Sequence, residues 1–385
     1  MTSTYQQLCP VLFGPDAAGE LGTKVQELGG TNAILIYDKG IGGTGIVDTF
    51  VKDLKEHSIK TTLFDGVLPD APKDMVNEAG KLAQDKKVDV IIGIGGGSSL
   101  DTAKAVSILA ENPLPIDQYY PQKQKAFTQN LPLILIPTAS GTGSEVTAMS
   151  VIHDEDTDAK EFVLRPGNLA ILDPKLTLSV PASVTAATAL DAMSHAVEAL
   201  TTNCGNPKAD LLALHAIRLI TENLPTAYIN GKDLDARTAL SLASNFAGMA
   251  FGDASVHFGH AAAHEMGIRF HMPHGEACAI TLPEVIRFSA DVIPEKTKQI
   301  AEALGLTVPE NINGLKIGEM AAERVRELMR SVGIKSLKDR GISREDVLDC
   351  AKGAVEKNWF VICALKKVDE EVMKQELADM YDNYR

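Results

Sequence analysis

The sequence predicts a two-part fold, an N-terminal α/β domain built on a parallel sheet and an all-helical C-terminal domain. Short β-branched apolar runs alternate with helical stretches up to about residue 180, which is typical of parallel strands covered by helices on both faces. After Pro181 these runs stop, and Ala-, Leu- and Glu-rich segments with helical spacing follow. We therefore expect one domain over residues 1–180 and a second over residues 181–385.

Each predicted element has a local signal. The expected strands are AILIY (33–37), TTLFD (61–65), VDVIIGI (88–94), LPLILIP (131–137) and LAILD (169–173). The helical half is represented by TALDAMSHAVEALTT (188–202) and ENINGLKIGEMAAERVRELMRSVG (310–333). Pro181, followed by Ser183 and Thr185, marks the expected start of its first helix.

Composition narrows the class of protein. The chain has 385 residues and a formal net charge of -14, and its Lys and Arg residues form no basic arm, so nucleic acid is not an expected partner. No segment approaches the roughly 18 to 20 apolar residues of a membrane helix, and the N-terminus lacks a signal-peptide pattern, so we expect a cytoplasmic protein. The five cysteines form no CxxC pair, which predicts reduced, partly buried thiols.

A glycine-rich turn follows the third expected strand in VDVIIGIGGGSSLDTAKAVSILA. Gly95, Gly96 and Gly97 would let backbone amides at a helix start approach a phosphate. The dinucleotide fingerprint is imperfect, because Ser98 replaces its third glycine and the best ribose-binding acid, Asp38, precedes the glycines. Ser98 and Asp101 could instead form an ordinary S-x-x-D capping box, and both interpretations stay open here.

A second loop rich in small residues, PTASGTGSEVT (137–147), follows the fourth expected strand. It is either a simple turn or part of a ligand site, because α/β proteins bind ligands at the carboxyl ends of parallel strands.

Histidines and a carboxylate suggest a metal site in the helical half. Asp191 and His195 are four residues apart on a predicted helix, His260 and His264 repeat that spacing, and His274 lies at an expected turn. Such a set could bind Fe, Zn, Mn or Co as a divalent ion. An isolated HxxxH pair is more often surface or core, and the hydrolytic HExxH motif is absent. Five of the nine histidines lie between residues 257 and 274, however, which favours a metal.

A dinucleotide loop together with a Lewis-acidic metal suggests hydride transfer between an alcohol and a nicotinamide. The motifs GGGSSLDTAK, PTASGTGSEVT, LDAMSHAVEA and GHAAAHEMG…MPHG occur in the order found in the iron-containing (group III) alcohol dehydrogenases. Over about residues 5 to 355 the sequence resembles that family, which includes lactaldehyde:propanediol oxidoreductases and 1,3-propanediol dehydrogenases. The resemblance implies a dehydroquinate synthase-like fold, with an NAD-binding α/β domain, a helical metal-binding and catalytic domain, and a homodimer.

The resemblance also assigns roles to individual residues. It implies that the metal ligands are Asp191, His195, His260 and His274. It implies that His264 assists proton transfer and that the carboxylate of Asp38 accepts the adenosine ribose hydroxyls, which favours NAD over NADP. The remaining cofactor positions are Gly95, Gly96, Gly97, Ser98, Asp101, Thr138, Thr142, Thr147 and Lys160, the last in a loop read as DTDAKEFV.

The substrate pocket departs from the family pattern at three positions. Trp359 lies in KNWFVICALKKVD where relatives often carry Asn-Pro-Arg, His257 replaces a small residue, and Arg269 lies between two ligands. Taken one at a time, Trp359 would be a packed indole, His257 a surface histidine and Arg269 a surface arginine. Together they suggest a narrow, cationic pocket for a short anionic aldehyde such as sulfoacetaldehyde or a semialdehyde.

The expected protein is thus a metal-dependent, NAD(H)-linked alcohol dehydrogenase that works as an aldehyde reductase. Fe²⁺ is the expected metal, with Zn²⁺ or another divalent ion left open. The alternatives are an enzyme of the glycerol dehydrogenase or dehydroquinate synthase branch, and a noncatalytic nucleotide or metal sensor.

Overall fold

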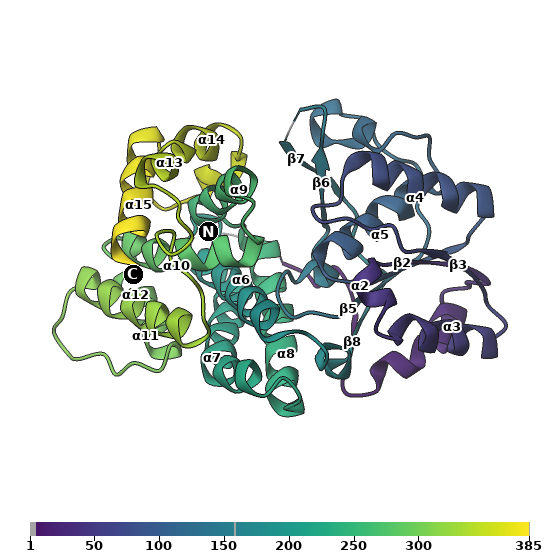
Figure 1. The fold of residues 1–385 in the computed structure, drawn as a ribbon, viewed down its shortest axis with the longest axis horizontal. Helices are drawn as coiled ribbons and strands as arrows, with labels where there is room; N and C mark the ends of the chain where they lie inside the picture. Colours follow the sequence, from purple (N-terminus) through teal and green to yellow (C-terminus); the bar gives the residue numbers. More distant parts are fainter. Residues whose placement is uncertain (1–4, 158, 385) are drawn as a thin grey trace. The chain divides into compact units, whose positions relative to one another are not determined.

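The computed structural model describes residues 5–157 and 159–384, which divide into two compact units. One unit contains residues 6–139 and 143–179, and the other contains residues 180–384 together with Ser140–Thr142 and Tyr5. Each unit is coloured along the chain in Figure 1.

Within the described residues, the first unit is built on a six-stranded parallel sheet with the order β1-β8-β5-β4-β2-β3. Its strands are β1 (Val11–Phe13), β2 (Asn32–Ile36), β3 (Lys60–Phe64), β4 (Val90–Gly95), β5 (Leu133–Pro137) and β8 (Leu169–Leu172). An antiparallel hairpin of β6 (Met149–Asp154) and β7 (Ala159–Leu164) is attached to it. The five strands expected from the sequence are present, whereas β1 and the hairpin were not predicted.

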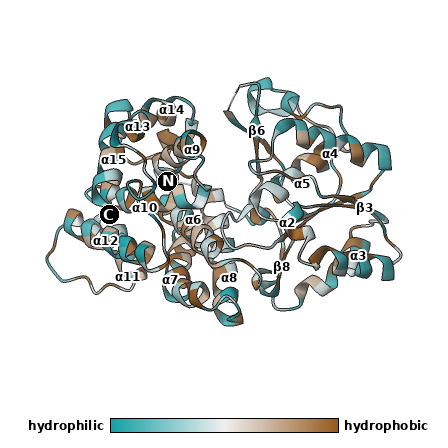
Figure 2. Cartoon of the chain, in the orientation of Figure 1, coloured by the Kyte–Doolittle hydropathy of each residue, from teal (hydrophilic) through white to brown (hydrophobic). Residues whose placement is uncertain are grey.

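Helices cover both faces of the sheet because the central strands are apolar on both sides. In β2, Ile34 and Ile36 pack in the core with α4 and α5, whereas Ala33 and Leu35 pack in the core with α1 and α3. These helices are α1 (Leu21–Glu27), α3 (Ile46–Glu56), α4 (Lys73–Lys86) and α5 (Gly97–Leu109), with a short α2 (Lys39–Gly42) after β2. Figure 2 shows hydrophobic and hydrophilic residues side by side on α3 and α4, as expected for helices with one buried face.

After Val180, the described part of the second unit is built from helices joined by loops, with one isolated β-bridge between Thr202 and Ala364. Its longer helices are α6 (Ala182–Leu200), α7 (Pro207–Ile229), α8 (Leu234–Ala254), α9 (Phe258–Phe270), α10 (His274–Ser289), α11 (Pro294–Ala303), α12 (Gly314–Ser331) and α15 (Glu370–Asn383). Shorter segments are α13 (Arg344–Leu348), α14 (Cys350–Glu356) and the 3₁₀ helix η6 (Trp359–Cys363). No stretch of helix within residues 5–157 and 159–384 combines the length and hydropathy of a membrane-spanning segment.

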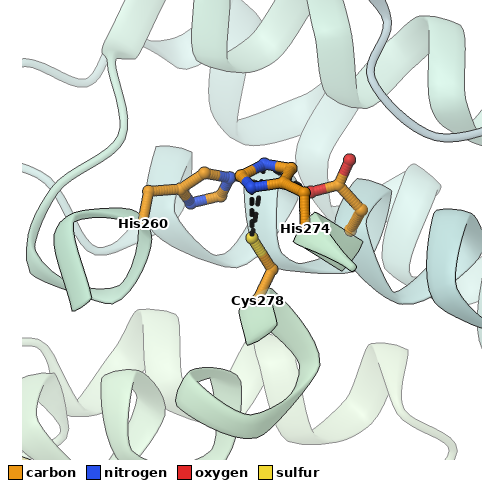
Figure 3. Close-up of side chains that lie close together, drawn as sticks. His260, His274 and Cys278 are labelled. Carbon is orange, nitrogen blue, oxygen red and sulfur yellow. Dashed lines mark hydrogen bonds and ion pairs between the residues drawn. The ribbon is translucent and has the colours of Figure 1, made fainter. Parts of the chain in front are cut away.

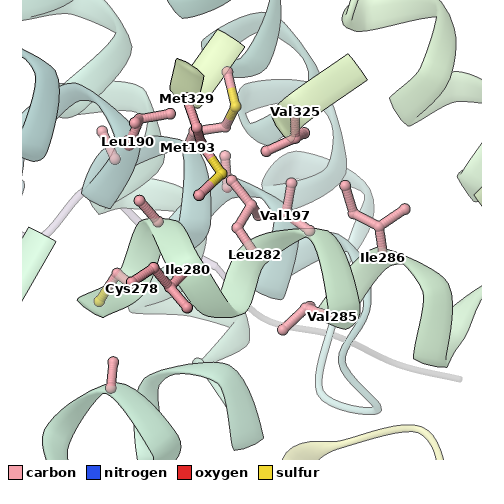
Figure 4. Close-up of a cluster of buried hydrophobic side chains, with 14 of the residues drawn as sticks. Leu190, Met193, Val197, Cys278, Ile280, Leu282, Val285, Ile286, Val325 and Met329 are labelled. Atoms are coloured by element: carbon pink, nitrogen blue, oxygen red, sulfur yellow. The ribbon is translucent and has the colours of Figure 1, made fainter. Parts of the chain in front are cut away.

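Helix α6 lies at the centre of the helical core. Leu190, Met193 and Val197 of α6 contribute to one apolar cluster with residues of α10 and α12 (Figure 4). Nearly every position of α6 after Thr185 is buried, so its polar residues must find partners inside the protein. This helix therefore places the first part of the candidate site in a buried environment.

Candidate active site

Three helices bring the predicted metal ligands together. Asp191 and His195 lie one turn apart on α6, and His260 lies on α9. His274, expected in a turn, is instead the first residue of α10, with Pro273 as its N-cap. Proline is well suited to this place because a helix start requires no backbone N–H from it. The expected arrangement of two helices and a loop is therefore corrected to three helices.

The ligand atoms surround one carboxylate oxygen. Asp191 Oδ1 lies 3.5 Å from His274 Nε2, 3.8 Å from His260 Nε2 and 4.0 Å from His195 Nε2. Asp191 Oδ1 and His260 Nε2 are buried without a hydrogen-bond partner among the described residues. Donors bound about 2.1 Å from a tetrahedral cation lie roughly 3.4 Å apart, so the spacing of Asp191 with His274 and His260 fits a divalent metal ion, and His195 lies farther out.

The protonation states of Asp191 and His195 suit metal binding as well. Burial lowers the pKa of His195 to about 3, so its imidazole is neutral at physiological pH. Burial opposes ionisation of Asp191, but the imidazoles of His195, His274 and His260 around its carboxylate outweigh it and leave its pKa far below the usual value. A carboxylate and neutral imidazoles are the forms that bind metals. Burial would lower the pKa of His260, but Cys278 and Glu198 raise it well above the usual value, so this imidazole must lose a proton when a metal binds.

A buried glutamate that the sequence analysis missed supports His260. Glu198 Oε1 lies 2.5 Å from His260 Nδ1 and accepts the backbone N–H of His260, while Oε2 accepts that of His257. Burial would raise the pKa of Glu198, but its interactions with His260 and His257 hold it at about 2. The signal was present in the sequence, since Glu198 follows Asp191 by seven residues on the same face of α6.

Cys278 is a second neighbour that the sequence analysis did not place here. Its Sγ lies 3.5 Å from His274 Nε2, one helical turn further along α10 (Figure 3). Donor atoms of Asp191, His260, His274 and Cys278 all lie within 4.8 Å of one another. Burial raises the pKa of the Cys278 thiol to about 12.

His264 lies beside this group on α9. Its Nδ1 is 3.0 Å from Asn358 Oδ1, and the Asn358 amide donates to the Ala354 carbonyl at 3.1 Å. The second bond orients the amide so that its oxygen faces the ring, which favours a proton on Nδ1 and leaves Nε2 as the acceptor nitrogen.

The glycine loop joins β4 to α5 in the first unit. Gly95 has a φ of 143°, and a Cβ there would lie 2.6 Å from Ser99 Oγ, so this position requires glycine. Gly96 is the N-cap of α5 and Gly97 its first residue. Ser98 lies within the helix, and its Oγ accepts the backbone N–H of Asp70 at 3.1 Å. The alternative of a capping box from Ser98 to Asp101 is therefore wrong.

A cavity of about 530 Å³ adjoins this loop. Its lining residues are Asp38, Lys39, Gly40, Asp65, Gly66, Val67, Leu68, Pro69, Gly96, Gly97, Ser98 and Ser99. Asp38 follows β2, and its carboxylate accepts the backbone N–H of Ile41 at 3.1 Å as the N-cap of α2. The carboxyl ends of β2 and β4 thus place an acid and the start of a helix on one cavity, an arrangement suited to a ribose and a phosphate.

The other predicted cofactor residues fall into separate environments. Asp101 Oδ1 accepts Ser144 Oγ at 2.6 Å, and its Oδ2 accepts the backbone N–H of Val151, so it ties α5 to β6. Thr138 and Thr147 are buried in the first unit, and Thr142 belongs to the helical unit. Lys160 lies in strand β7 rather than in a loop, and its Nζ lies 3.0 Å from Asp70 Oδ1.

Comparison with known proteins identifies the family. The family model described as "Iron-containing alcohol dehydrogenase" matches residues 10–174, and "Fe-containing alcohol dehydrogenase family, C-terminal" matches residues 185–381. The chain belongs to the iron-containing alcohol dehydrogenases. It is 38% identical over 344 residues to 1,3-propanediol dehydrogenase of Klebsiella pneumoniae, which covers 87% of each chain.

Solved structures agree with this family assignment. A crystal structure of 1,3-propanediol oxidoreductase matches with a TM-score of 0.92 and 33% identity, covering 98% of this chain and 100% of the other. Sulfoacetaldehyde reductase from Bifidobacterium kashiwanohense in complex with NAD⁺ matches with a TM-score of 0.90 and 25% identity, covering 99% of this chain and 100% of the other. The predicted fold class is confirmed, and the protein is an oxidoreductase with NAD(H) and iron as its cofactors. Neither the glycerol dehydrogenase-like alternative nor the sensor is favoured.

The residues expected to make the substrate pocket of this alcohol dehydrogenase cationic do not do so. His257 is fully buried rather than on the surface, its Nε2 lies 2.9 Å from Thr201 Oγ1, and burial lowers its pKa. Arg269 pairs with Asp349 at 3.0 Å on the exposed side of α9. His257 is therefore held neutral, and the charge of Arg269 is paired with a carboxylate. The expectation that these two residues give the substrate pocket a positive charge is corrected.

Trp359 also differs from its expected environment. As the first residue of η6 it is 55% exposed, so it is not a packed indole. Its ring contacts Phe360 edge to face, with centroids 5.8 Å apart, and Phe360 in turn contacts His264 at 5.6 Å. Phe360, rather than Trp359, therefore contacts His264, and Phe251 stacks on His195 with ring centroids 4.3 Å apart.

Proposed function

We propose that this family member reduces short-chain aldehydes to alcohols with NADH, using a divalent metal ion held by Asp191, His195, His260 and His274. One observation carries the proposal: in the part of the chain that the structure describes, Asp191 Oδ1 and His260 Nε2 are buried without hydrogen-bond partners where three imidazoles approach the carboxylate. When bound, the metal supplies Lewis acidity toward an alcohol or aldehyde oxygen, and the nicotinamide supplies or accepts hydride.

Neighbouring residues set the protonation and the orientation of the ligand side chains. His195 is kept neutral by burial, and Glu198 holds the His260 ring by its Nδ1, which directs Nε2 toward Asp191. Ligating histidines commonly donate their second nitrogen to a carboxylate in this way, which fixes the tautomer and the ring orientation.

His264 is the proposed proton-transfer residue. Its ring lies 5.4 Å from that of His274 and 6.4 Å from that of His260, and the hydrogen bond to Asn358 sets its orientation. With Nδ1 donating to Asn358, Nε2 can accept a proton from a substrate hydroxyl directly or through water. Asn358 acts as a positioning residue, because it reaches the substrate only through His264.

The proposed cofactor site is the cavity beside the glycine loop. The amides of Gly96 and Gly97 at the start of α5 would hold a pyrophosphate, and Asp38 would accept ribose hydroxyls. Lys160 approaches the same region, since its partner Asp70 donates its backbone N–H to Ser98 Oγ. We assign Thr138, Thr142, Thr147 and Asp101 to the cofactor side on the family resemblance.

An aldehyde panel tests the proposed function. The protein is loaded anaerobically with Fe²⁺ and mixed with NADH and short aldehydes, both neutral and anionic, the latter including sulfoacetaldehyde. We expect metal-dependent loss of NADH absorbance, with neutral aldehydes at least as good as anionic ones, because neither His257 nor Arg269 offers a free positive charge. NADH binding with full metal occupancy but without turnover of any aldehyde would refute the proposal.

A variant pair tests the role of His264. His264→Ala should lower kcat by about 10² or more with a smaller change in KM, since a proton-transfer group acts mainly in the transition state. Asn358→Ala should give a weaker loss and a shifted pH profile. Equal kcat values in both variants and the wild type would exclude this role for His264.

The homodimer and the cytoplasmic location are also part of the proposal. Light scattering of the purified protein should give twice the 41.1 kDa mass of one chain. A mass of one chain at micromolar concentration would contradict the dimer.

A further inference from the structure

The thiol of Cys278 lies among the predicted metal ligands. Its Sγ is 3.5 Å from His274 Nε2 and 3.9 Å from His274 Nδ1. Figure 3 shows the sulfur facing the imidazole of His274, with His260 on the adjacent helix. The spacing from His274 to Cys278 is four residues, so both side chains lie on one face of α10.

The backbone fixes this position of the sulfur. The Cys278 carbonyl accepts hydrogen bonds from Ser194 Oγ at 3.1 Å and from Thr281 Oγ1 at 3.0 Å. One turn earlier, Gly275 packs so closely on α6 that a Cβ would overlap the carbonyl oxygen of Ala187. The first two turns of α10 are thus held against α6, and the thiol is held with them.

The thiols of two other buried cysteines have different hydrogen-bond partners. Cys9 and Cys350 donate their thiols to the backbone carbonyls of Pro10 and Asp346. The Cys278 thiol instead contacts the ring nitrogens of His274. Beside it lie Asp191 Oδ1 and His260 Nε2, two buried polar atoms without hydrogen-bond partners among the described residues. A core cysteine would need only apolar neighbours or a carbonyl.

We propose that Cys278 Sγ is an additional donor to the bound metal ion. This inference rests on the proposed function, because it concerns the same site. On binding, the cation displaces the thiol proton, Cys–SH + M²⁺ → Cys–S–M⁺ + H⁺, and the proton leaves to solvent. The resulting mixed nitrogen, oxygen and sulfur set is softer than one carboxylate with three imidazoles, so it favours Zn²⁺, Co²⁺ and Cd²⁺ over Mn²⁺.

Cobalt spectroscopy tests the donor directly. We would load the wild-type protein and the variants Cys278→Ser and Cys350→Ser with Co²⁺ and record visible and near-ultraviolet absorption. We expect cobalt d–d bands in all three, and a sulfur-to-cobalt charge-transfer band in the wild type and Cys350→Ser but not in Cys278→Ser. Cys350 is a matched control, since it is equally buried but donates to a carbonyl.

Metal competition gives an independent measurement. The ratio of Cd²⁺ to Mn²⁺ affinity should fall by at least about tenfold in Cys278→Ser, the scale seen for lost partners of a metal site. Cobalt d–d bands without charge transfer in the wild type would overturn the inference while leaving the proposed function standing. Absence of any bound cobalt would overturn both. The wild-type spectrum decides the question even if the serine variant fails to fold.

Discussion

Glu198 and His260 form a buried carboxylate–imidazole pair, with 2.5 Å between Oε1 and Nδ1. Both side chains are almost fully buried, and the same carboxylate accepts two backbone N–H groups at the start of α9. The pair therefore fixes both the ring of a predicted ligand and the helix that carries it.

Glu198→Gln should weaken metal binding by about 10- to 100-fold, because the amide cannot fix the His260 tautomer as a carboxylate does. Competition with a chromophoric chelator measures the affinity. Glu222→Gln, an exposed position on α7, is the control and should leave it unchanged. A metal affinity that stays at the wild-type value in Glu198→Gln would show that the pair has only a structural role.

Gly275→Ala should push the start of α10 away from α6. A Cβ at this position would overlap the Ala187 carbonyl oxygen and lie 3.3 Å from Asp191 Cβ. Overpacking of this kind costs about 1–3 kcal/mol of the free energy of unfolding, and here it also displaces His274. Denaturant unfolding and metal titration measure the two effects. Gly267→Ala on α9, where a Cβ meets only ordinary contacts, should change neither, and identical behaviour of the two variants would count against this packing role.

Asp38→Asn should relax the preference for NADH over NADPH. The carboxylate lines the cavity beside the glycine loop, where its charge would repel a ribose 2′-phosphate. Removing that charge should shift the ratio of kcat/KM values by about tenfold or more toward NADPH, which corresponds to ~1.4 kcal/mol. The asparagine oxygen can still cap α2, so stability should change little. An unaltered ratio would place the ribose elsewhere.

Glu376 should make stability depend on pH. Burial, followed by the charges of Glu284 and Asp379, raises its pKa to about 8, despite the opposing charges of Arg287 and Lys366. The native state therefore holds a proton that the unfolded chain releases near pH 4.5, so the free energy of unfolding falls as pH rises from about 4.5 to about 8. Glu376→Gln should flatten this fall in urea unfolding, whereas Glu371→Gln, exposed on the same helix, should retain it. A parallel fall in both variants would assign the pH dependence to other groups.

The predictable parts of the fold are those with local signals. The five expected strands are present within a residue or two because continuous apolar runs need burial on both faces. The hairpin of β6 and β7 was missed because MSVIHD mixes polar and apolar residues. Its stability depends on tertiary partners, such as the bond from the Val151 N–H to Asp101.

In the candidate site, too, only the features with a local sequence signal could be predicted. Helical spacing placed Asp191 with His195 and His260 with His264, but the convergence of α6, α9 and α10 depends on packing that no single segment encodes. Reading His274 as part of a turn concealed its relation to Cys278 on one helix face. The burial of His257 followed from Glu198 and Thr201, which are distant in sequence.

The most direct test of the account is the metal content of an Asp191→Asn variant. After anaerobic loading with Fe²⁺ and gel filtration, the wild type and the exposed-site control Asp235→Asn should each retain about one iron per chain. Asp191→Asn should retain less than about a tenth of that with unchanged circular dichroism, because it removes the one carboxylate ligand. Iron retained by Asp191→Asn at wild-type stoichiometry and affinity would contradict a metal centre built on this residue.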